Sequence, residues 1–287
     1  MTLVWSSIAL GAVYAIVAIG YNIVFIASRV FNFAQAQFVM IGAYVAVVAG
    51  TTLGLPLPVA LLLCAIVGAV LGMIEEFVAV RWLYTRDQHN VLVTTLGAAT
   101  ILSGVALVTF GSQPRTVPYF DSSTTLDLLG GRVGVADLLV IAVAAALAIL
   151  VALITRRTTI GLTALAAAED RSAAMLRGIN VRWLAVGAFA LAGAALAVAG
   201  PVVASKTYVN FDLGDNLAVK GFVVLAIGGY GSQTGAIIGG LAVGFLEIFA
   251  ARYLGSDWRN VAVFVVLLVI MAIRPHGIFG RAEGRTV

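Results

Sequence analysis

Long apolar stretches, separated by short polar segments, run along the whole chain. A helix that crosses the hydrocarbon core of a bilayer needs about 20 consecutive, predominantly apolar residues. Nine stretches are candidates for such helices: 3–27, 31–50, 57–80, 91–110, 134–155, 183–204, 217–230, 234–251 and 260–273. We therefore predict an all-α polytopic membrane protein with about eight transmembrane helices plus half-helix or re-entrant segments. Residues 1–287 are expected to form a single transmembrane domain.

One of these stretches is too short to cross the membrane. The 14 residues of 217–230 cover only about two-thirds of the hydrocarbon core at ~1.5 Å per residue, which favours a half-helix. The stretch runs into Gly228-Gly229-Tyr230-Gly231-Ser232, where the backbone is expected to unwind because glycine lacks a Cβ atom. Unwound backbone at membrane depth is tolerated only inside protein or beside a water-filled cavity. This segment is therefore predicted to line a path.

A second stretch, 31–50, begins with the amides Asn32, Gln35 and Gln37, where lipid-facing residues would be apolar. Broken helices of this kind point to the substrate route of a transporter. Amides, hydroxyls and glycine backbone give the weak contacts from which a cargo can leave again. The candidate path residues are Asn32, Gln35, Gly229, Gly231, Ser232 and Gln233. Hydrogen bonds between helices are an equally good interpretation of Asn32 and Gln35.

Composition supports a membrane location and excludes several other classes. The chain is 62% hydrophobic and 10% charged with a mean hydropathy of +1.08, whereas soluble domains carry about 25% charged residues. Its one cysteine, Cys64, lies in an apolar stretch, and its two histidines, His89 and His276, lie far apart. No disulfide framework and no metal site is therefore expected. The net charge of +4 is typical of a membrane orientation signal rather than of nucleic-acid binding.

Basic residues are retained on the cytoplasmic side of membrane proteins, so their distribution predicts orientation. With the amino terminus outside and the carboxyl terminus inside, eleven arginines are cytoplasmic and five basic residues are external. The cytoplasmic arginines are Arg29, Arg81, Arg86, Arg156, Arg157, Arg171, Arg177, Arg182, Arg274, Arg281 and Arg285. The external residues are Arg115, Arg132, Lys206, Arg252 and Arg259. This excess predicts an N-out, C-in orientation.

The cytoplasmic segment 156–182 has the composition of a structured element. It is rich in alanine, leucine and arginine, which are strong helix formers, whereas a disordered tether would be polar. Asp170 suits a helix N-cap, and Gly178 suits the left-handed position just past a helix end. We predict two short helices with a turn near Glu169 and Asp170. Because ordered helices outside the bilayer need a surface to pack on, the segment is predicted to dock onto another protein.

Eight short motifs occur in order along the chain. They are Gly20-Tyr-Asn-Ile-Val-Phe, Arg29-Val30-Phe31-Asn32-Phe33-Ala34, Glu75 with Arg81, Thr95-Leu96-Gly97, Ala168-Glu169-Asp170 with Ala173-Ala174, Leu176 and Gly178-Ile179-Asn180, Lys220-Gly221-Phe222, Gly228-Gly229-Tyr230-Gly231-Ser232 with Gly235, and Arg274-Pro275-His276-Gly277-Ile278-Phe279-Gly280. In this combination, and over nearly its whole length, the chain resembles the integral-membrane permease subunits of branched-chain amino-acid ABC importers.

Two positions depart from the usual pattern of that family. Gln35-Ala36 stands where the family commonly has His-Gly, and Arg81-Trp82-Leu83 stands where it commonly has Arg-Pro-Leu. The first exchange keeps a hydrogen-bonding side chain but removes a titratable one. This exchange is compatible with the same fold, but it leaves the identity of the transported cargo undetermined.

The resemblance implies a subunit of a bacterial inner-membrane importer that pairs with a second, related permease. The pair would rest on two cytoplasmic ATPases and receive cargo from an external binding protein. The chain itself would not be an enzyme and would need no cofactor, since it contains no Gly-x-x-x-x-Gly-Lys-Ser/Thr loop for ATP. No nucleic-acid partner is expected.

In this setting, residues 169–180 are predicted to form the coupling helix that transmits closure of the ATPases. Glu169 and Asp170 would stand at its amino end, where the helix dipole favours negative charge, and Arg177 near its carboxyl end. The alternative is a loop helix that only balances charge. The predicted coupling residues are Glu169, Asp170, Arg171, Ala173, Arg177, Gly178, Ile179 and Asn180.

Charges inside predicted spans are costly and tend to be paired or functional. Glu75 and Glu76 lie within about two turns of Arg81 and are expected to be structural. Glu247 is expected to face protein, with Arg252 as a candidate partner five residues on.

Other functions fit less of the sequence. A permease for urea or short amides would share the same family pattern, so the cargo stays open within the amino-acid and amide range. A secondary transporter would use broken helices but has no need of a structured cytoplasmic loop of 27 residues. A channel is supported only by the Gly-Gly-Tyr-Gly run, and an intramembrane protease lacks a Gly-x-Ser-x-Gly elbow.

Overall fold

The structure is a computed structural model that describes residues 1–83, 88–120, 124–128 and 130–280. Within that part of the chain, seven helices are long and apolar enough to cross a membrane. They are α1 (Thr2–Ser28), α2 (Gln37–Thr51), α3 (Leu57–Glu75), α4 (Gln88–Phe110), α5 (Val135–Arg157), α8 (Val181–Lys206) and α10 (Gln233–Tyr253). Three of the arginines that predict orientation, Arg86, Arg281 and Arg285, lie outside the described residues.

Short turns lengthen two of these helices. The 3-10 turn η1 (Phe33–Ala36) precedes α2, and the π-helical turn η2 (Glu76–Val80) continues α3 and is followed by η3 (Arg81–Leu83). The shorter apolar helices are α9 (Leu213–Gly228) and α11 (Trp258–Ile273). Every one of the nine predicted stretches therefore corresponds to a helix, which confirms the all-α polytopic class.

The predicted half-helix is present, but its bounds differ. Helix α9 begins four residues earlier than the predicted stretch 217–230 and ends two residues earlier. The reason lies in the preceding turn, which folds back into the bundle: Val209 is fully buried and exchanges two backbone hydrogen bonds with Arg115 at 2.8 and 2.9 Å. The 16 residues of α9 extend about 24 Å, which is still shorter than the hydrocarbon core.

Helix α1 lies at the centre of the bundle. Of its most apolar window, 83% is buried, whereas only 22% is buried in α3 and in α5. Close approach of α10 to α1 depends on small residues: a Cβ atom added at Gly244 would lie 2.6 Å from the carbonyl oxygen of Ser7. Small residues at helix interfaces serve this purpose in membranes, where no hydrophobic effect drives helices together.

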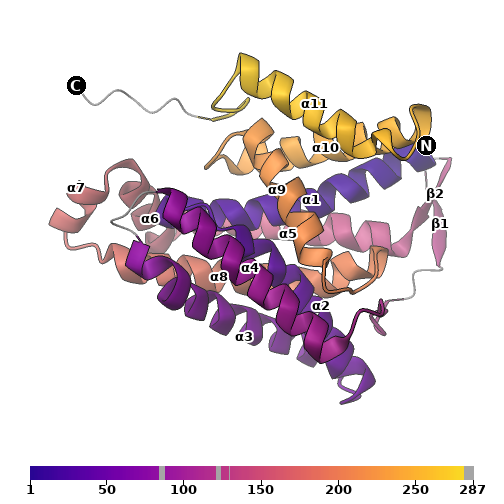
Figure 1. Cartoon of the computed structure of the whole chain (residues 1–287), viewed down its shortest axis with the longest axis horizontal. Helices are drawn as coiled ribbons and strands as arrows, with labels where there is room; N and C mark the ends of the chain where they lie inside the picture. Colours follow the sequence, from indigo (N-terminus) through magenta and orange to yellow (C-terminus); the bar gives the residue numbers. More distant parts are fainter. Residues whose placement is uncertain (84–87, 121–123, 129, 281–287) are drawn as a thin grey trace.

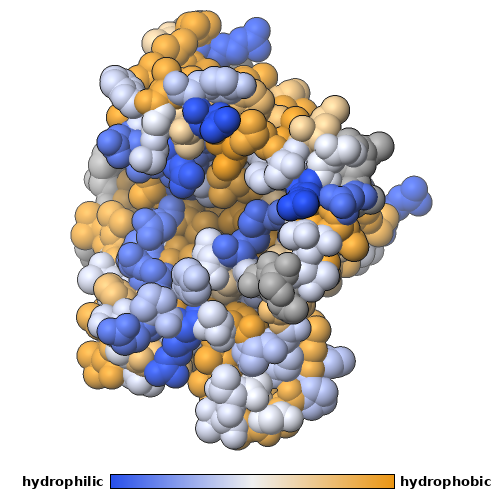
Figure 2. All heavy atoms as spheres, turned by 90° about the vertical axis from the view of Figure 1, so that its right-hand side faces the viewer, coloured by the Kyte–Doolittle hydropathy of each residue, from blue (hydrophilic) through white to orange (hydrophobic). Residues whose placement is uncertain are grey.

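The two ends of the bundle carry different structures (Figure 1). At one end lie α6 (Thr159–Glu169) and α7 (Arg171–Leu176). At the other lie the amino terminus and a hairpin of β1 (Thr125–Leu128) and β2 (Gly131–Gly134). Figure 2 looks onto the hairpin end, where hydrophilic residues spread among hydrophobic ones.

The hairpin is an addition to the predicted helical architecture. Its strands are antiparallel, with Thr125 opposite Gly134 and Asp127 opposite Arg132. It rests on the start of α1, where the backbone N–H of Arg132 donates to Oγ1 of Thr2 at 3.2 Å. Strands of four residues around a glycine turn carry too little alternation to stand out beside long apolar stretches.

Candidate functional site: a translocation path and a coupling loop

The amide-rich start of α2 is a break in the helix that its own side chains stabilise. Helix α1 ends at Ser28, and its C-cap Arg29 has a left-handed φ of 58°. Asn32 then caps η1: its Oδ1 accepts from the N–H of Ala34 at 3.0 Å, and its Nδ2 donates to Oε1 of Gln35 and Oε2 of Glu75, both at 3.0 Å. Both Asn32 and Gln35 are buried within this chain. Their contacts are those of interhelical hydrogen bonds, and their role in a path stays a prediction.

The two glutamates at the end of α3 have different partners. Glu75 accepts the hydrogen bond from Asn32 that is described above. Glu76 forms an ion pair with Arg81, with 3.5 Å between Oε2 and Nε, and the Arg81 guanidinium lies 3.8 Å from the centre of the Phe77 ring. Glu75 thus connects the end of α3 to the break before α2, and Glu76 holds Arg81 of η3, in agreement with the structural role predicted for both carboxylates.

The glycine-rich segment between α9 and α10 is unwound, as predicted. Gly229 and Gly231 have φ values of +100° and +76°, a region that side chains with a Cβ rarely adopt. Asn22 of α1 fixes the turn: its Oδ1 accepts from the N–H of Gly231 and its Nδ2 donates to the carbonyl of Ser232, both at 2.9 Å. Ser232 then caps α10, with Oγ accepting from the N–H of Gly235 at 3.0 Å.

A half-buried aromatic cluster lies between these two breaks. We call Phe31, Phe33, Phe222 and Tyr230 the aromatic cluster. Phe222 lies 5.3 Å from Phe31, 5.7 Å from Phe33 and 6.4 Å from Tyr230, measured between ring centroids. The fold therefore brings the predicted path segments 31–35 and 229–232 together around α9, although they are far apart in the sequence.

The amino end of α9 carries a carboxylate that the sequence analysis overlooked. Asp215 is exposed and accepts hydrogen bonds from Nε2 of Gln37 at 2.6 Å and from Oγ of Ser103 at 3.0 Å. Ser103 lies seven residues before the end of α4, which places it about 10 Å inside that helix end at ~1.5 Å per residue. Asp215 lies just before the apolar run 217–230, and its position there was the one available signal.

Glu247 connects four helices. Its Oε2 accepts from the Tyr14 hydroxyl at 2.7 Å and from Nζ of Lys220 at 3.1 Å, and its Oε1 lies 3.5 Å from Nε of Arg259. The prediction that Glu247 faces protein is confirmed. The candidate partner Arg252 is wrong, because five residues along a helix turn a side chain about 140° away from the face that Glu247 occupies.

Segment 156–182 forms the two predicted helices. Helix α6 ends at Glu169, and Asp170 begins α7 as its N-cap, with Oδ1 accepting from the N–H of Ala173 at 2.9 Å. The predicted coupling helix 169–180 is shorter in the structure: α7 spans Arg171–Leu176, Glu169 belongs to α6, and Asn180 is the N-cap of α8. Arg177 is the C-cap, and Gly178 has the predicted left-handed φ of +83°.

The loop is tied to the end of α1. The guanidinium of Arg29 donates to the carbonyl of Ala168, and Nη1 of Arg171 donates to the carbonyl of Ser28 at 3.4 Å. At the tip of the loop, Met175 and Leu176 are apolar yet 54% and 89% exposed. A loop held firmly at its base and apolar at its tip is suited to contact another protein.

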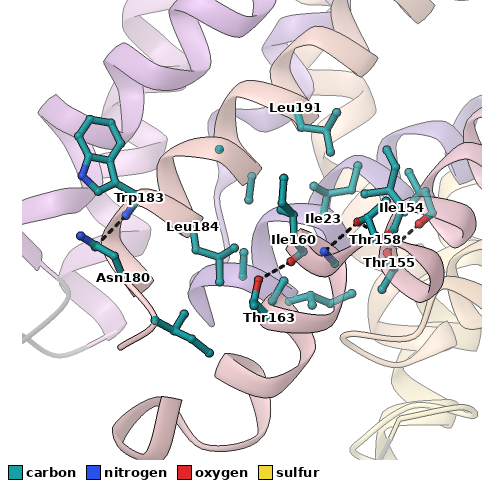
Figure 3. A pocket seen from close by; sticks show the side chains of 18 of the residues that line it. Ile23, Ile154, Thr155, Thr158, Ile160, Thr163, Asn180, Trp183, Leu184 and Leu191 are labelled. Atoms are coloured by element: carbon teal, nitrogen blue, oxygen red, sulfur yellow. Dashed lines mark hydrogen bonds between the residues drawn. The ribbon is translucent and has the colours of Figure 1, made fainter. Parts of the chain in front are cut away.

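A cavity of about 770 Å³ is lined by residues of α1, α5, α6 and α8. Figure 3 shows its walls, to which Ile23 of α1, Ile154 of α5, Ile160 of α6 and Leu184 of α8 contribute. The predicted path residue Gln233 also lines it. Among the described residues, no group of three or more metal-ligating side chains gathers here or elsewhere.

Comparison with known proteins identifies the family. Residues 3–272 match the family described as "Branched-chain amino acid transport system / permease component". The chain is 30% identical to the "High-affinity branched-chain amino acid transport system permease protein BraD" of Pseudomonas aeruginosa, over 97% of this chain and 95% of that protein. It is 29% identical to the corresponding permease protein LivH of Escherichia coli K12, with the same two coverages.

A solved structure has a similar fold. PsaBC from Streptococcus pneumoniae, determined in complex with a Fab, matches with a TM-score of 0.50 at 13% identity, covering 96% of this chain and 93% of that one. Together with the apolar helices, the bacterial relatives indicate a multi-pass protein of the inner membrane. The chain belongs to the family of branched-chain amino-acid transport system permease components.

Proposed function

We propose that this chain forms one half of the membrane path of an ATP-driven importer for branched-chain amino acids. Members of the family act in membrane complexes with ATPases and a binding protein. ATP hydrolysis resides in the ATPase subunits and not in the permease. The proposal for the cargo rests on the relatives' names and on one observation in this chain: the half-buried aromatic cluster beside unwound backbone offers an apolar but changeable surface. Such a surface suits a branched side chain that has to bind weakly and leave.

The path residues proposed are Asn32, Gln35, Gly229, Gly231, Ser232 and Gln233. The glycine turn and the amide-rich turn flank the aromatic cluster, so a change in either turn would move its rings. Within this account, residues 1–287 act as a single transmembrane permease domain.

The complex that we propose contains a second, related permease, two cytoplasmic ATPases and an external binding protein, with this chain oriented N-out and C-in. The weakly buried helices α3 and α5 leave surface for lipid and for the second permease. The ATPases would contact Glu169, Asp170, Arg171, Ala173, Arg177, Gly178, Ile179 and Asn180. Support comes from the apolar tip of α7 and from its two capping residues.

Uptake by the reconstituted importer tests this function. The permease, its sister subunit, the ATPases and the binding protein are placed in proteoliposomes, and entry of radiolabelled leucine, isoleucine and valine is measured with internal or external ATP. We expect accumulation against a gradient only when ATP reaches the ATPases. Uptake of urea or short amides in place of amino acids would contradict the proposed cargo. Uptake by the permease alone, without ATP, would contradict the importer itself.

A further inference from the structure

One face of α9 pairs a carboxylate with apolar side chains. Asp215, Val219 and Phe222 follow one another at spacings of four and three residues, so they form a single stripe along the helix. Asp215 and Val219 are exposed, and Phe222 is half-buried in the aromatic cluster. From Asp215 to Phe222 the stripe is about 10 Å long at ~1.5 Å per residue, which is the scale of one amino acid.

Two hydrogen bonds hold the carboxylate of Asp215 in place. Its two hydrogen-bond donors, Gln37 and Ser103, are uncharged and buried, and among the described residues no lysine or arginine forms an ion pair with it. Gln37 is fully buried, and its Oε1 has no hydrogen-bond partner. A carboxylate without a cationic partner is costly where it faces lipid, so this face has to border water or protein.

We infer that Asp215 receives the α-ammonium group of the transported amino acid, while Val219 and Phe222 contact its branched side chain. This inference rests on the proposed function and names the site at which the cargo is held. Gln37 and Ser103 are positioning residues that fix the two carboxylate oxygens toward the path. The neighbouring amide of Asn216 is exposed beside the carboxylate.

A purely structural role is the alternative for the same residue. The positive end of a helix dipole stabilises an acidic side chain in the first turn, and Asp215 has that position in α9. This role would make Asp215 matter for stability but not for the choice of cargo. The two roles are separated by measuring uptake, ATP hydrolysis and cargo selectivity in the same complexes.

The test uses the complete importer in proteoliposomes with D215N, D215E and V219F. We expect D215N to lower leucine uptake at least tenfold while ATP hydrolysis stimulated by the loaded binding protein stays within twofold of wild type. D215E, which keeps the charge, should restore a third or more of the uptake. V219F should lower leucine uptake at least threefold more than valine uptake, because the larger ring shortens the space for the side chain.

D257N is the matched control, since Asp257 is an exposed carboxylate that precedes α11 and lies off this stripe. D215N uptake within twofold of wild type, or parallel loss of uptake and ATP hydrolysis, would overturn the site alone. If wild-type complexes transported no branched-chain amino acid into the proteoliposomes, the proposed function would be overturned, and the site with it.

Discussion

At the scale of single residues, buried charges connect helices that the sequence keeps apart. Glu247 of α10 binds Tyr14 of α1, Lys220 of α9 and Arg259 at the start of α11. Lys220 also donates to Oδ1 of Asn260 at 2.7 Å. Sequence analysis could place Glu247 against protein because a charge in a span needs a partner. It could not find the partners, because local spacing reaches only the same helix.

Replacing Glu247 with glutamine should destabilise the bundle. The E247Q side chain keeps nearly the same shape but leaves Lys220 and Arg259 without a negative partner, and breaking a buried ion pair in this way costs about 3–5 kcal/mol. We expect a lower thermal unfolding midpoint for the detergent-purified protein. D127N is the control, because the side chain of Asp127 is 83% exposed and its pair with Arg132 lies on the surface. An E247Q midpoint equal to wild type would show that the network contributes nothing to stability.

At the scale of elements, the loop and α9 show what local sequence determines. Helices α6 and α7 were predictable because their signals are local: a capping aspartate at 170 and a glycine with φ of +83° at 178. The start of α9 was not, because it depends on the long-range backbone bridge between Arg115 and Val209. The same shift of four residues brought Asp215 inside the helix and left it out of the predicted path.

The end of α7 is predicted to be essential for coupling. In G178V a β-branched side chain has to adopt a left-handed backbone, which costs about 1–3 kcal/mol and distorts the carboxyl end of α7. We expect a several-fold loss of ATPase stimulation by the loaded binding protein, with normal membrane insertion.

Gly54 provides the matched control for this substitution. It has a φ of +61°, and a Cβ atom added to either Gly54 or Gly178 meets nothing within 4 Å. Gly54 lies between α2 and α3, at the opposite end of the bundle from α7. G54V should therefore keep its ATPase stimulation. Equal stimulation in wild type, G178V and G54V would rule out the coupling role.

At the scale of the whole molecule, the bundle has a central helix, weakly buried flanks and two dissimilar ends. α1 is central, and α3 and α5 expose most of their apolar windows. Apolar stretches alone predict these spans because their length is fixed by the bilayer. Which helices become central could not be predicted, since that depends on close glycine contacts such as Gly244 against α1.

The central claim is that the α6–α7 end of the bundle contacts the ATPases, and cross-linking tests it most directly. The one native cysteine, Cys64, is fully buried, so a cysteine introduced on the surface reacts without background. In the assembled importer, L176C at the tip of α7 is alkylated with a maleimide that carries a photoreactive diazirine, and on illumination it should join an ATPase, whereas L53C treated in the same way at the opposite end should not. An unlinked L176C, or an ATPase joined to L53C, would contradict the account.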